Sequence, residues 1–267
     1  MIQIEKFARY LPAEVANFSI ITLVTFLQLG RQALFIPLRD DNSLKSIPFQ
    51  YVTVGLIAVN VLVYLLEVGG LSNAAVASFA VTPRELFGDA IAPALNPLGD
   101  EGLPINEQAT LLTYMFFHAD AFHLIGNMLF LWVFGDNVED AMGHARFLIF
   151  YLLCGVFAAL FHAWIVPGSD MPLIGASGAV AGVIAAYLML HPRVNVWVLA
   201  FKIIPLRITA GLVLGIWVIT QVVMVAMPDL GPVAWWAHIG GLIAGAVLIV
   251  FMRRPGVPLF DQGARLT

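Results

Sequence analysis

Four side chains suited to acyl-transfer chemistry lie in apolar stretches of the chain. His123 and Asn127 stand four residues apart, Ser177 lies in a Gly-Ala-Ser-Gly run, and His238 lies in an Ala-His-Ile-Gly-Gly run. A serine hydroxyl becomes a strong nucleophile when a base takes its proton, and neutral imidazole does this near pH 7. The oxyanion that follows needs hydrogen-bond donors. We therefore expect Ser177 to act as nucleophile and His238 as base, with His123, Asn127 and the Ser177 amide as the donors.

Composition indicates where these residues are placed. Of the 267 residues, 60% are hydrophobic and 11% are charged, whereas soluble domains carry about 25% charged residues. A soluble globule could not cover its surface with so few charges, so we expect a protein embedded in a lipid bilayer. The net charge of -4 comes without a basic cluster and predicts no nucleic acid partner. The one cysteine, Cys154, excludes an intramolecular disulfide and a Cys-based metal site.

Six apolar segments are near the length of about 20 residues that a membrane-spanning helix needs. They predict an all-α, polytopic bundle of six transmembrane helices, with a membrane domain over residues 49–254. An N-terminal cytoplasmic or interfacial segment (1–48) precedes it, and a cytoplasmic tail (255–267) follows. The segments are Phe49–Val68, Ala121–Val138, Phe147–Val166, Leu173–Leu190, Ile208–Met227 and Val233–Met252.

Two other parts of the chain are expected to contain helices that do not span the membrane. Residues Val15–Gly30 fit an interfacial amphipathic helix better than a seventh span, because they are short and carry a polar stripe. The loop of about 50 residues after the first segment is too long for a plain connector. Ala74–Phe79 and Pro83–Phe87 within it are candidates for short interfacial helices.

Positive charge predicts the orientation, because cytoplasmic loops carry the excess of Lys and Arg. Basic residues fill alternate connections, and the opposite connections hold Arg84 alone. Both termini are therefore expected in the cytoplasm, and the second, fourth and sixth helices start at the outer face. The basic residues on the cytoplasmic side are Arg39, Lys45, Arg146, Arg193, Lys202, Arg207, Arg253 and Arg254.

This orientation places the chemical residues at one depth. Each lies within about two turns of the outer end of its helix, so all should sit on the order of 5–10 Å below the outer interface. Structural interpretations compete for each residue alone: a serine bonds back to its own helix, a histidine sits at the interface, and an asparagine joins helices. Small residues favour convergence, because Gly175, Gly178 and Gly182 could pack against Ala237, Gly241 and Gly245. No acidic residue is near, so packing alone is expected to orient His238.

Together these motifs resemble the rhomboid family of intramembrane serine proteases. The matches are His123-x-x-x-Asn127, Gly175-x-Ser177-Gly178, Ala237-His238 and Glu139-x-x-x-Gly143-x-x-Arg146, in the family's order, within residues 37–254. The resemblance implies the roles given above for Ser177, His238, His123 and Asn127. It further implies that His118 organises the site or its water, and that Glu139 and Arg146 hold the cytoplasmic end of the second helix. Gly241 and Gly245 match the family's packing glycines in the sixth helix.

The chain departs from the family at two places. Well-known bacterial members have a Trp-Arg pair where Ala109-Thr110 stand here, so lipid anchoring by that pair is not expected. Some members stack an aromatic on the catalytic histidine, and Ala181 takes that position here. Another group must therefore hold the ring of His238.

The function expected from these observations is cleavage of single-span membrane proteins near the outer leaflet, through an acyl-enzyme on Ser177. No metal or cofactor is expected, and no His-Glu-x-x-His motif indicates a zinc protease. The expected location is a bacterial inner membrane. One alternative is a rhomboid-like protein that binds membrane segments without cutting them. A transporter or haem protein using the helix histidines is the other. No motif indicates the oligomeric state or the substrate.

Overall fold

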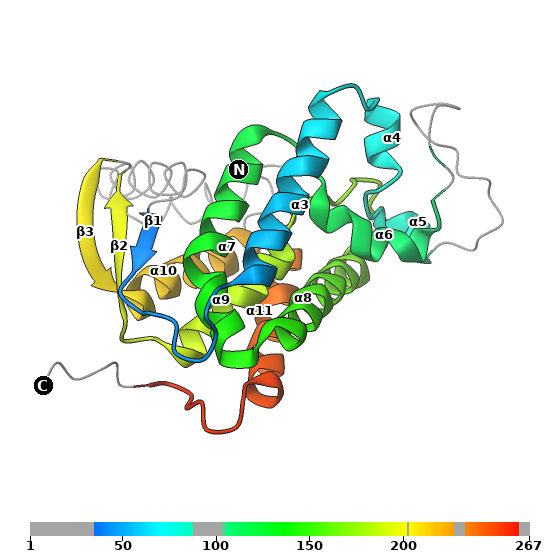
Figure 1. Cartoon of the computed structure of the whole chain (residues 1–267). Coiled ribbons are helices and arrows are strands. Elements are labelled where there is room, and N and C mark those ends of the chain that lie inside the picture. Colours follow the sequence, from blue (N-terminus) through cyan, green and yellow to red (C-terminus); the bar gives the residue numbers. More distant parts are fainter. Residues whose placement is uncertain (1–34, 88–102, 104, 202, 227–232, 262–267) are drawn as a thin grey trace, which may run out of the picture. The chain divides into compact units, whose positions relative to one another are not determined.

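The computed structural model describes residues 35–87, 103, 105–201, 203–226 and 233–261. The predicted interfacial helix at 15–30 lies outside these residues. The chain divides into two compact units, residues 1–36 with 198–206, and residues 37–197 with 207–267. Every residue of the candidate site belongs to the second, larger unit, which is mostly helical (Figure 1).

Three strands form a small sheet that the sequence analysis did not predict. β1 (Phe35–Asp40), β2 (Asn195–Ala200) and β3 (Ile204–Thr209) pair in the order β1-β2-β3. Alternate residues of β2 are buried, which is the two-residue period of a strand with one covered face. The sequence analysis had left β2 in the connection between the fourth and fifth predicted helices.

Six longer helices correspond to the six predicted segments. Their ends differ from the predicted ones by up to four residues. They are α3 (Tyr51–Val68), α7 (Ala121–Met142), α8 (His144–Ile165), α9 (Ser177–Leu190), α10 (Ala210–Val225) and α11 (Trp235–Met252).

Length and composition identify three of these helices as membrane spans: α3, α8 and α11. A fourth is possible if α7 counts together with the preceding α6 (Glu107–Thr113) and η1 (Tyr114–Phe116), which meet it at a bend of 81°. α9 and α10 are apolar but shorter, at 14 and 16 residues. The described residues therefore contain three or four spans by this measure, and the count of six stays a prediction.

The long loop after α3 contains both short helices that the sequence predicted. α4 covers Asn73–Ala77 and α5 covers Pro83–Phe87. Thr113 donates its hydroxyl hydrogen to the carbonyl oxygen of Phe79 (2.9 Å), and the rings of Phe79 and Phe117 stack at 4.6 Å. These contacts attach the loop to the segment that leads into α7.

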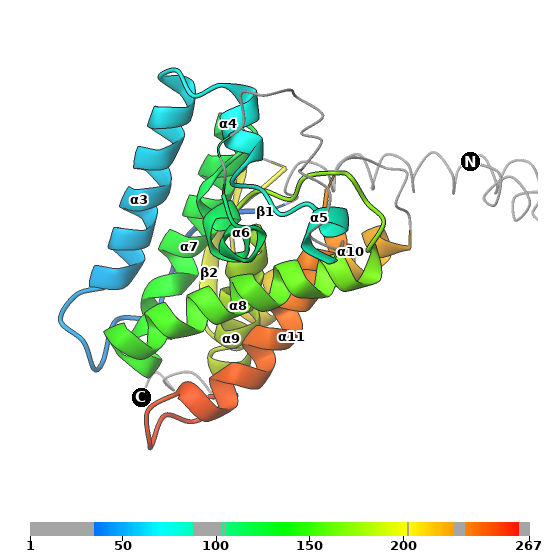
Figure 2. The same cartoon turned by 90° about the vertical axis from the view of Figure 1, so that its right-hand side faces the viewer.

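α9 is the central helix of the larger unit. Most of its residues are buried, and it packs against α7, α8 and α11, which lie around it in both views (Figures 1 and 2). Its first residue is Ser177, whereas we had predicted that this helix begins at Leu173. Gly175 explains this four-residue error, because its backbone has φ +119° and cannot continue a helix. Leu173 pairs instead with Val81 in an isolated antiparallel bridge.

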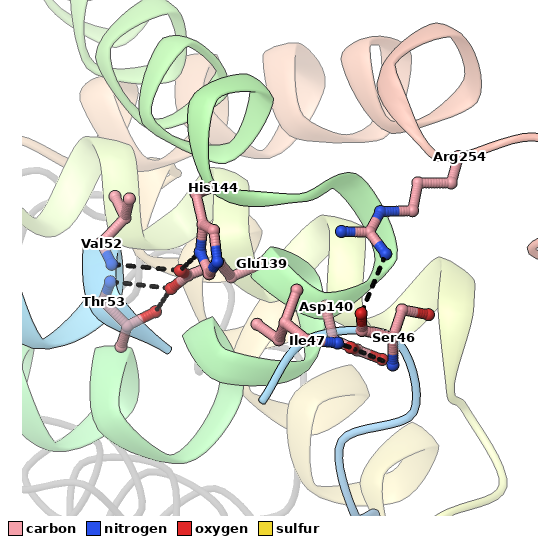
Figure 3. Close-up of polar contacts among 8 residues, drawn as sticks. All are labelled: Ser46, Ile47, Val52, Thr53, Glu139, Asp140, His144 and Arg254. Atoms are coloured by element: carbon pink, nitrogen blue, oxygen red, sulfur yellow. Dashed lines mark hydrogen bonds and ion pairs between the residues drawn. The ribbon is translucent and has the colours of Figure 1, made fainter. Parts of the chain in front are cut away.

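The C-terminal end of α7 contacts the start of α3 (Figure 3). The first amides of a helix have no partner within it, and the residue before α3, Gln50, makes no side-chain cap. Glu139, which lies on α7, caps α3 instead. Its carboxylate accepts hydrogen bonds from the amides of Val52 (3.0 Å) and Thr53 (2.8 Å) and from the Thr53 hydroxyl (2.7 Å). A negative charge at this position also interacts favourably with the α3 dipole.

The next residue, Asp140, fixes the segment that precedes α3. Its carboxylate accepts hydrogen bonds from the amides of Ser46 (2.6 Å) and Ile47 (2.7 Å). Arg254, just after α11, donates its amide hydrogen to the carbonyl of Ala141 (2.8 Å) and its guanidinium to the carbonyl of Ser46 (3.4 Å). Figure 3 shows how one end of α7 thus joins the chain before α3 to the end of α11.

The sequence analysis expected Arg146 to help Glu139 hold this end of α7. Among the described residues no ion pair joins Arg146 to Glu139, which lies instead against the ring of His144 (2.5 Å). Arg146 is exposed on the first turn of α8. Glu139 therefore holds this end of α7 through the free amides of α3, and the role expected for Arg146 stays a prediction.

Candidate active site

Ser177 and His238 are in direct contact across two helices. Ser177 Oγ lies 2.9 Å from His238 Nε2, within hydrogen-bonding distance. Ser177 is the first residue of α9 and is half-buried, whereas His238 lies in the first turn of α11 and is buried. Because Ser177 begins its helix, its own amide is one of those left without an intrahelical acceptor. A hydroxyl, an imidazole and a free amide donor thus occur at one place.

Glycines allow this contact by bringing the two backbones together. A Cβ atom at Gly241 would collide with the carbonyl oxygen of Gly178, and one at Gly245 would collide with that of Gly182. The small-residue faces predicted from the sequence therefore do meet. With α9 and α11 packed backbone to backbone, Ser177 and His238 are close enough to bond.

His123, on α7, packs against Gly175, a position that has room only for glycine. Gly175 has φ +119°, and a Cβ atom there would lie 2.6 Å from Cε1 and 2.8 Å from Nε2 of His123. Its amide donates to the carbonyl of Tyr114 (2.9 Å), which fixes the turn before α9. The ring of His123 consequently rests on the backbone two residues before Ser177.

Asn127 follows His123 by one turn of α7, the helix that packs along α9. Its side chain is buried, and its Nδ2 has no hydrogen-bond partner within the part of the chain that the structure describes. Buried amide nitrogens are normally bonded, and an unbonded one calls for an explanation. A donor held free of partners is suited to an oxygen that gains charge only during a reaction.

His118 lies beside His123, outside any helix. The two rings meet edge to face at 5.1 Å, and neither ring nitrogen of His118 has a partner among the described residues, although the ring is buried. The amide of His118 donates to Glu67 at 3.2 Å. The structure therefore brings His118 next to His123 without a bond to Ser177 or His238.

The sequence analysis missed Gln221, which lies on α10. Gln221 Oε1 is 2.8 Å from His238 Nδ1, the ring nitrogen that faces away from Ser177. Trp235 meets the His238 ring edge to face at 5.7 Å, and Trp217 lies at 6.1 Å. We had expected packing alone to orient the His238 ring, but the structure shows that the side-chain amide of Gln221 also contacts it. A lone amide within an apolar segment was the available signal, since polar groups in spans are functional candidates.

The arrangement contains the chemical groups that nucleophilic acyl transfer needs. It offers a hydroxyl bonded to an imidazole, an amide oxygen on the far side of that imidazole, and donors on α7 and α9. Over the described ranges, no group of three or more His, Cys, Asp or Glu side chains is placed to hold a metal ion.

Comparisons with known proteins agree on one family. The family model of the Rhomboid domain matches residues 106–255. RHOMBOID-like protein 12, mitochondrial, of Arabidopsis thaliana is 28% identical over 162 residues, which is 54% of this chain and 46% of that protein. Rhomboid-like protein 11, chloroplastic, of the same plant is 30% identical over 166 residues, 58% of this chain and 56% of its own length.

A human relative matches a longer part of the chain. Presenilin-associated rhomboid-like protein, mitochondrial, of Homo sapiens is 27% identical over 212 residues, or 76% of this chain and 48% of that protein. The chain spans about half the length of the curated relatives it matches.

Proposed function

Because the chain belongs to the rhomboid family, a family of multi-pass membrane proteins, we propose that it is an intramembrane serine endopeptidase. The observation that carries the proposal is the 2.9 Å contact between Ser177 Oγ and His238 Nε2. The two residues match the two family motifs expected to supply nucleophile and base. A serine hydroxyl bonded to an imidazole is the arrangement that nucleophilic cleavage needs, whereas binding alone does not need it.

The reaction begins when His238 Nε2 takes the hydroxyl proton of Ser177 as Oγ attacks the scissile carbonyl carbon. The resulting oxyanion is stabilised by the Ser177 amide and by the side chains of Asn127 and His123. Collapse breaks the C–N bond, and His238 returns its proton to the leaving amine. Water then attacks the acyl-enzyme, with His238 again removing a proton, and Ser177 is released with a new carboxylate product.

The length of α9 supports a site below the outer membrane surface. Fourteen residues at about 1.5 Å each span roughly 21 Å, about 9 Å less than a hydrocarbon core of about 30 Å. If the last residue of α9 lies at the cytoplasmic interface, Ser177 lies on the order of 10 Å below the outer one. This depth follows from the orientation that we propose from the charge distribution, in which both termini are cytoplasmic and the chain has six spans.

The substrates we propose are proteins with a single membrane span. A span enters from the side and must unwind near the cut, because a helical peptide bond is shielded by its own hydrogen bonds. Small residues, Gly or Pro near the cleavage site make this unwinding easier. The relatives named above carry mitochondrial and chloroplastic names, so they do not support our sequence-based expectation of a bacterial inner membrane.

The test uses the purified full chain in detergent with a model single-span substrate. We expect cleavage by the wild type and none by Ser177→Ala or His238→Ala. Ser43→Ala is the matched control, because Ser43 is exposed and remote from the site. A fluorophosphonate should label the wild type and the control on Ser177 and leave Ser177→Ala unlabelled. Equal product from wild type and both site variants would reject the proposal, and stable binding of uncut substrate by wild type would favour a binding protein.

A further inference from the structure

We propose that Gln221 is a positioning residue that holds His238 in its working tautomer and orientation, so that the functional unit is Ser177–His238–Gln221. The inference rests on the proposed function, because a tautomer matters only if His238 acts as a base. It replaces the unaided dyad that the sequence suggested. The reasoning starts from the hydrogen bonds of Gln221 itself.

The amide of Gln221 can face only one way. Its Nε2 lies 2.9 Å from the carbonyl oxygen of Trp217 and 3.0 Å from Thr220 Oγ1. A backbone carbonyl only accepts hydrogen bonds, so the group facing it must be the NH₂ donor. The Thr220 hydroxyl uses its own hydrogen on the same carbonyl at 2.6 Å, and it is therefore an acceptor for Gln221. Both hydrogens of Nε2 are thus engaged, and Oε1 must be the atom that faces His238.

The orientation of this amide determines the tautomer of His238. Gln221 Oε1 can only accept, so the Nδ1 atom of His238 at 2.8 Å must carry the proton. In the neutral ring the other nitrogen, Nε2, then has its lone pair free. That atom is the one 2.9 Å from Ser177 Oγ. The serine hydroxyl therefore donates to His238, which is the arrangement needed for removal of its proton. The opposite tautomer would place the lone pair of Nδ1 against that of Oε1.

Burial makes this selection strong. Gln221 is 4% exposed and His238 is 9% exposed, so little water is available to replace either bond, and hydrogen bonds in such surroundings are stronger than in water. A neutral amide orients the ring without burying an unpaired charge. Within the part of the chain that the structure describes, the other titratable side chains that act on His238 are His123 on α7 and His162 on α8, and neither is bonded to its ring.

A purely structural role is the competing explanation, since amides in membrane helices often join neighbouring helices. Two variants separate these roles. Gln221→Leu removes the acceptor. Gln221→Glu keeps an acceptor of the same shape and adds a negative charge beside Nδ1. Asn60→Leu is the matched control, because Asn60 is a buried amide on α3 that likewise donates to its own helix, to the Leu56 carbonyl at 2.8 Å.

For Gln221→Leu we expect kcat to fall about 10-fold to 100-fold with KM nearly unchanged. Loss of a charged orienting group in serine proteases costs about 10⁴, and a neutral amide should contribute less. For Gln221→Glu we expect the acid limb of the pH–rate profile to move upward by about one pH unit, because a nearby negative charge stabilises imidazolium. Asn60→Leu should lower the melting temperature and leave kcat and the pH profile as in wild type.

Both substrate cleavage and the rate of fluorophosphonate labelling of Ser177 are measured from pH 5 to 9. Wild-type kcat in a folded Gln221→Leu, or an unmoved acid limb in Gln221→Glu, would overturn the inference while leaving the protease intact. If Gln221→Leu does not elute as a folded protein, the acid limb of Gln221→Glu decides. A wild type that neither cleaves nor labels would instead remove the proposed function, and the role of Gln221 with it.

Discussion

Gly241 of α11 lies directly against the backbone carbonyl oxygen of Gly178 of α9, with no room between them for a Cβ atom. The residue before Gly178 is Ser177, and His238 lies one turn before Gly241 on the same helix. The separation of the two helix backbones at this point therefore determines whether the hydroxyl and the imidazole can bond. The packing of two glycines and the chemistry of the site depend on one contact.

Replacing Gly241 by alanine should push α11 away from α9. We expect the free energy of unfolding to fall by about 1–3 kcal/mol, as in other overpacked cores, and cleavage to fall with it because Ser177 and His238 separate. Gly55→Ala is the matched control: Gly55 lies in α3, where an added Cβ meets nothing within 4 Å. Alanine there should be neutral or stabilise by up to about 1 kcal/mol. Thermal unfolding in detergent and substrate cleavage measure both effects.

Removing the free amide of Asn127 should slow the reaction without weakening substrate binding. Loss of one oxyanion donor typically costs about 10² to 10³ in kcat, and we expect a loss of this order for Asn127→Ala with KM changed little. Steady-state kinetics on the model substrate provide the measurement. Gly126→Ala, at the neighbouring position with open space around its Cβ, should retain wild-type kcat. A kcat for Asn127→Ala within about twofold of that of the wild type would exclude Asn127 from the oxyanion site.

Glu139 should matter for stability far more than Arg146. Glu139→Gln weakens the cap on α3 by removing the charge that three donors of Val52 and Thr53 share, so we expect a loss of about 1–3 kcal/mol. Arg146→Ala, at an exposed position, should change stability by less than about 0.5 kcal/mol. The exposed Glu85→Gln serves as the charge-matched control. Equal losses for Glu139→Gln and Arg146→Ala in thermal unfolding would contradict this difference and show that Arg146 also helps to hold this end of α7.

Asp40, which lies before the first membrane helix, should make stability depend on pH. Burial raises the pKa of Asp40 to about 6, against the lowering effect of the hydrogen bond from the Tyr187 hydroxyl. The folded state then binds the proton more tightly than the unfolded chain does, so the stability that Asp40 contributes is complete below its ordinary pKa of 3.8 and is lost as pH rises through about 6.

Substitution of Asp40 by asparagine should remove this slope, because asparagine can accept the same hydrogen bonds without titrating. Melting temperatures from pH 4 to 8 should then decline less for Asp40→Asn than for the wild type, and the variant should be the more stable protein above pH 7. Asp170→Asn alters an exposed carboxylate paired with Arg84 and should keep the wild-type slope. Parallel curves for wild type and Asp40→Asn would show that this carboxylate is not protonated near pH 6.

The meeting of Ser177 and His238 could be anticipated from the sequence because two independent patterns pointed to it. Charge placed the two residues at one depth, and small residues on each helix predicted that the backbones approach. Neither pattern needs the details of side-chain packing. The start of α9 was harder, because Leu173 is apolar enough to extend a span, and only the backbone angle of Gly175 shows that the helix begins later.

Gln221 and the strands were not predicted, and for related reasons. The apolar neighbours of Gln221 made its segment look like a plain span, and its partner His238 is 17 residues away on another helix. Asn195–Ala200 was left in a connection between predicted spans, and its alternating pattern was not used. In both cases the deciding contact joins segments that no local rule brings together.

Gln221 reaches His238 from α10, whereas Ser177 reaches it from α9. If α10 moved away by little more than the length of a hydrogen bond, Gln221 would lose its bond to His238. The contact between Ser177 and His238 would remain. The ring would then be free to turn, and kcat should fall as predicted above for Gln221→Leu. The position of α10 and the orientation of the His238 ring are therefore coupled through this one hydrogen bond.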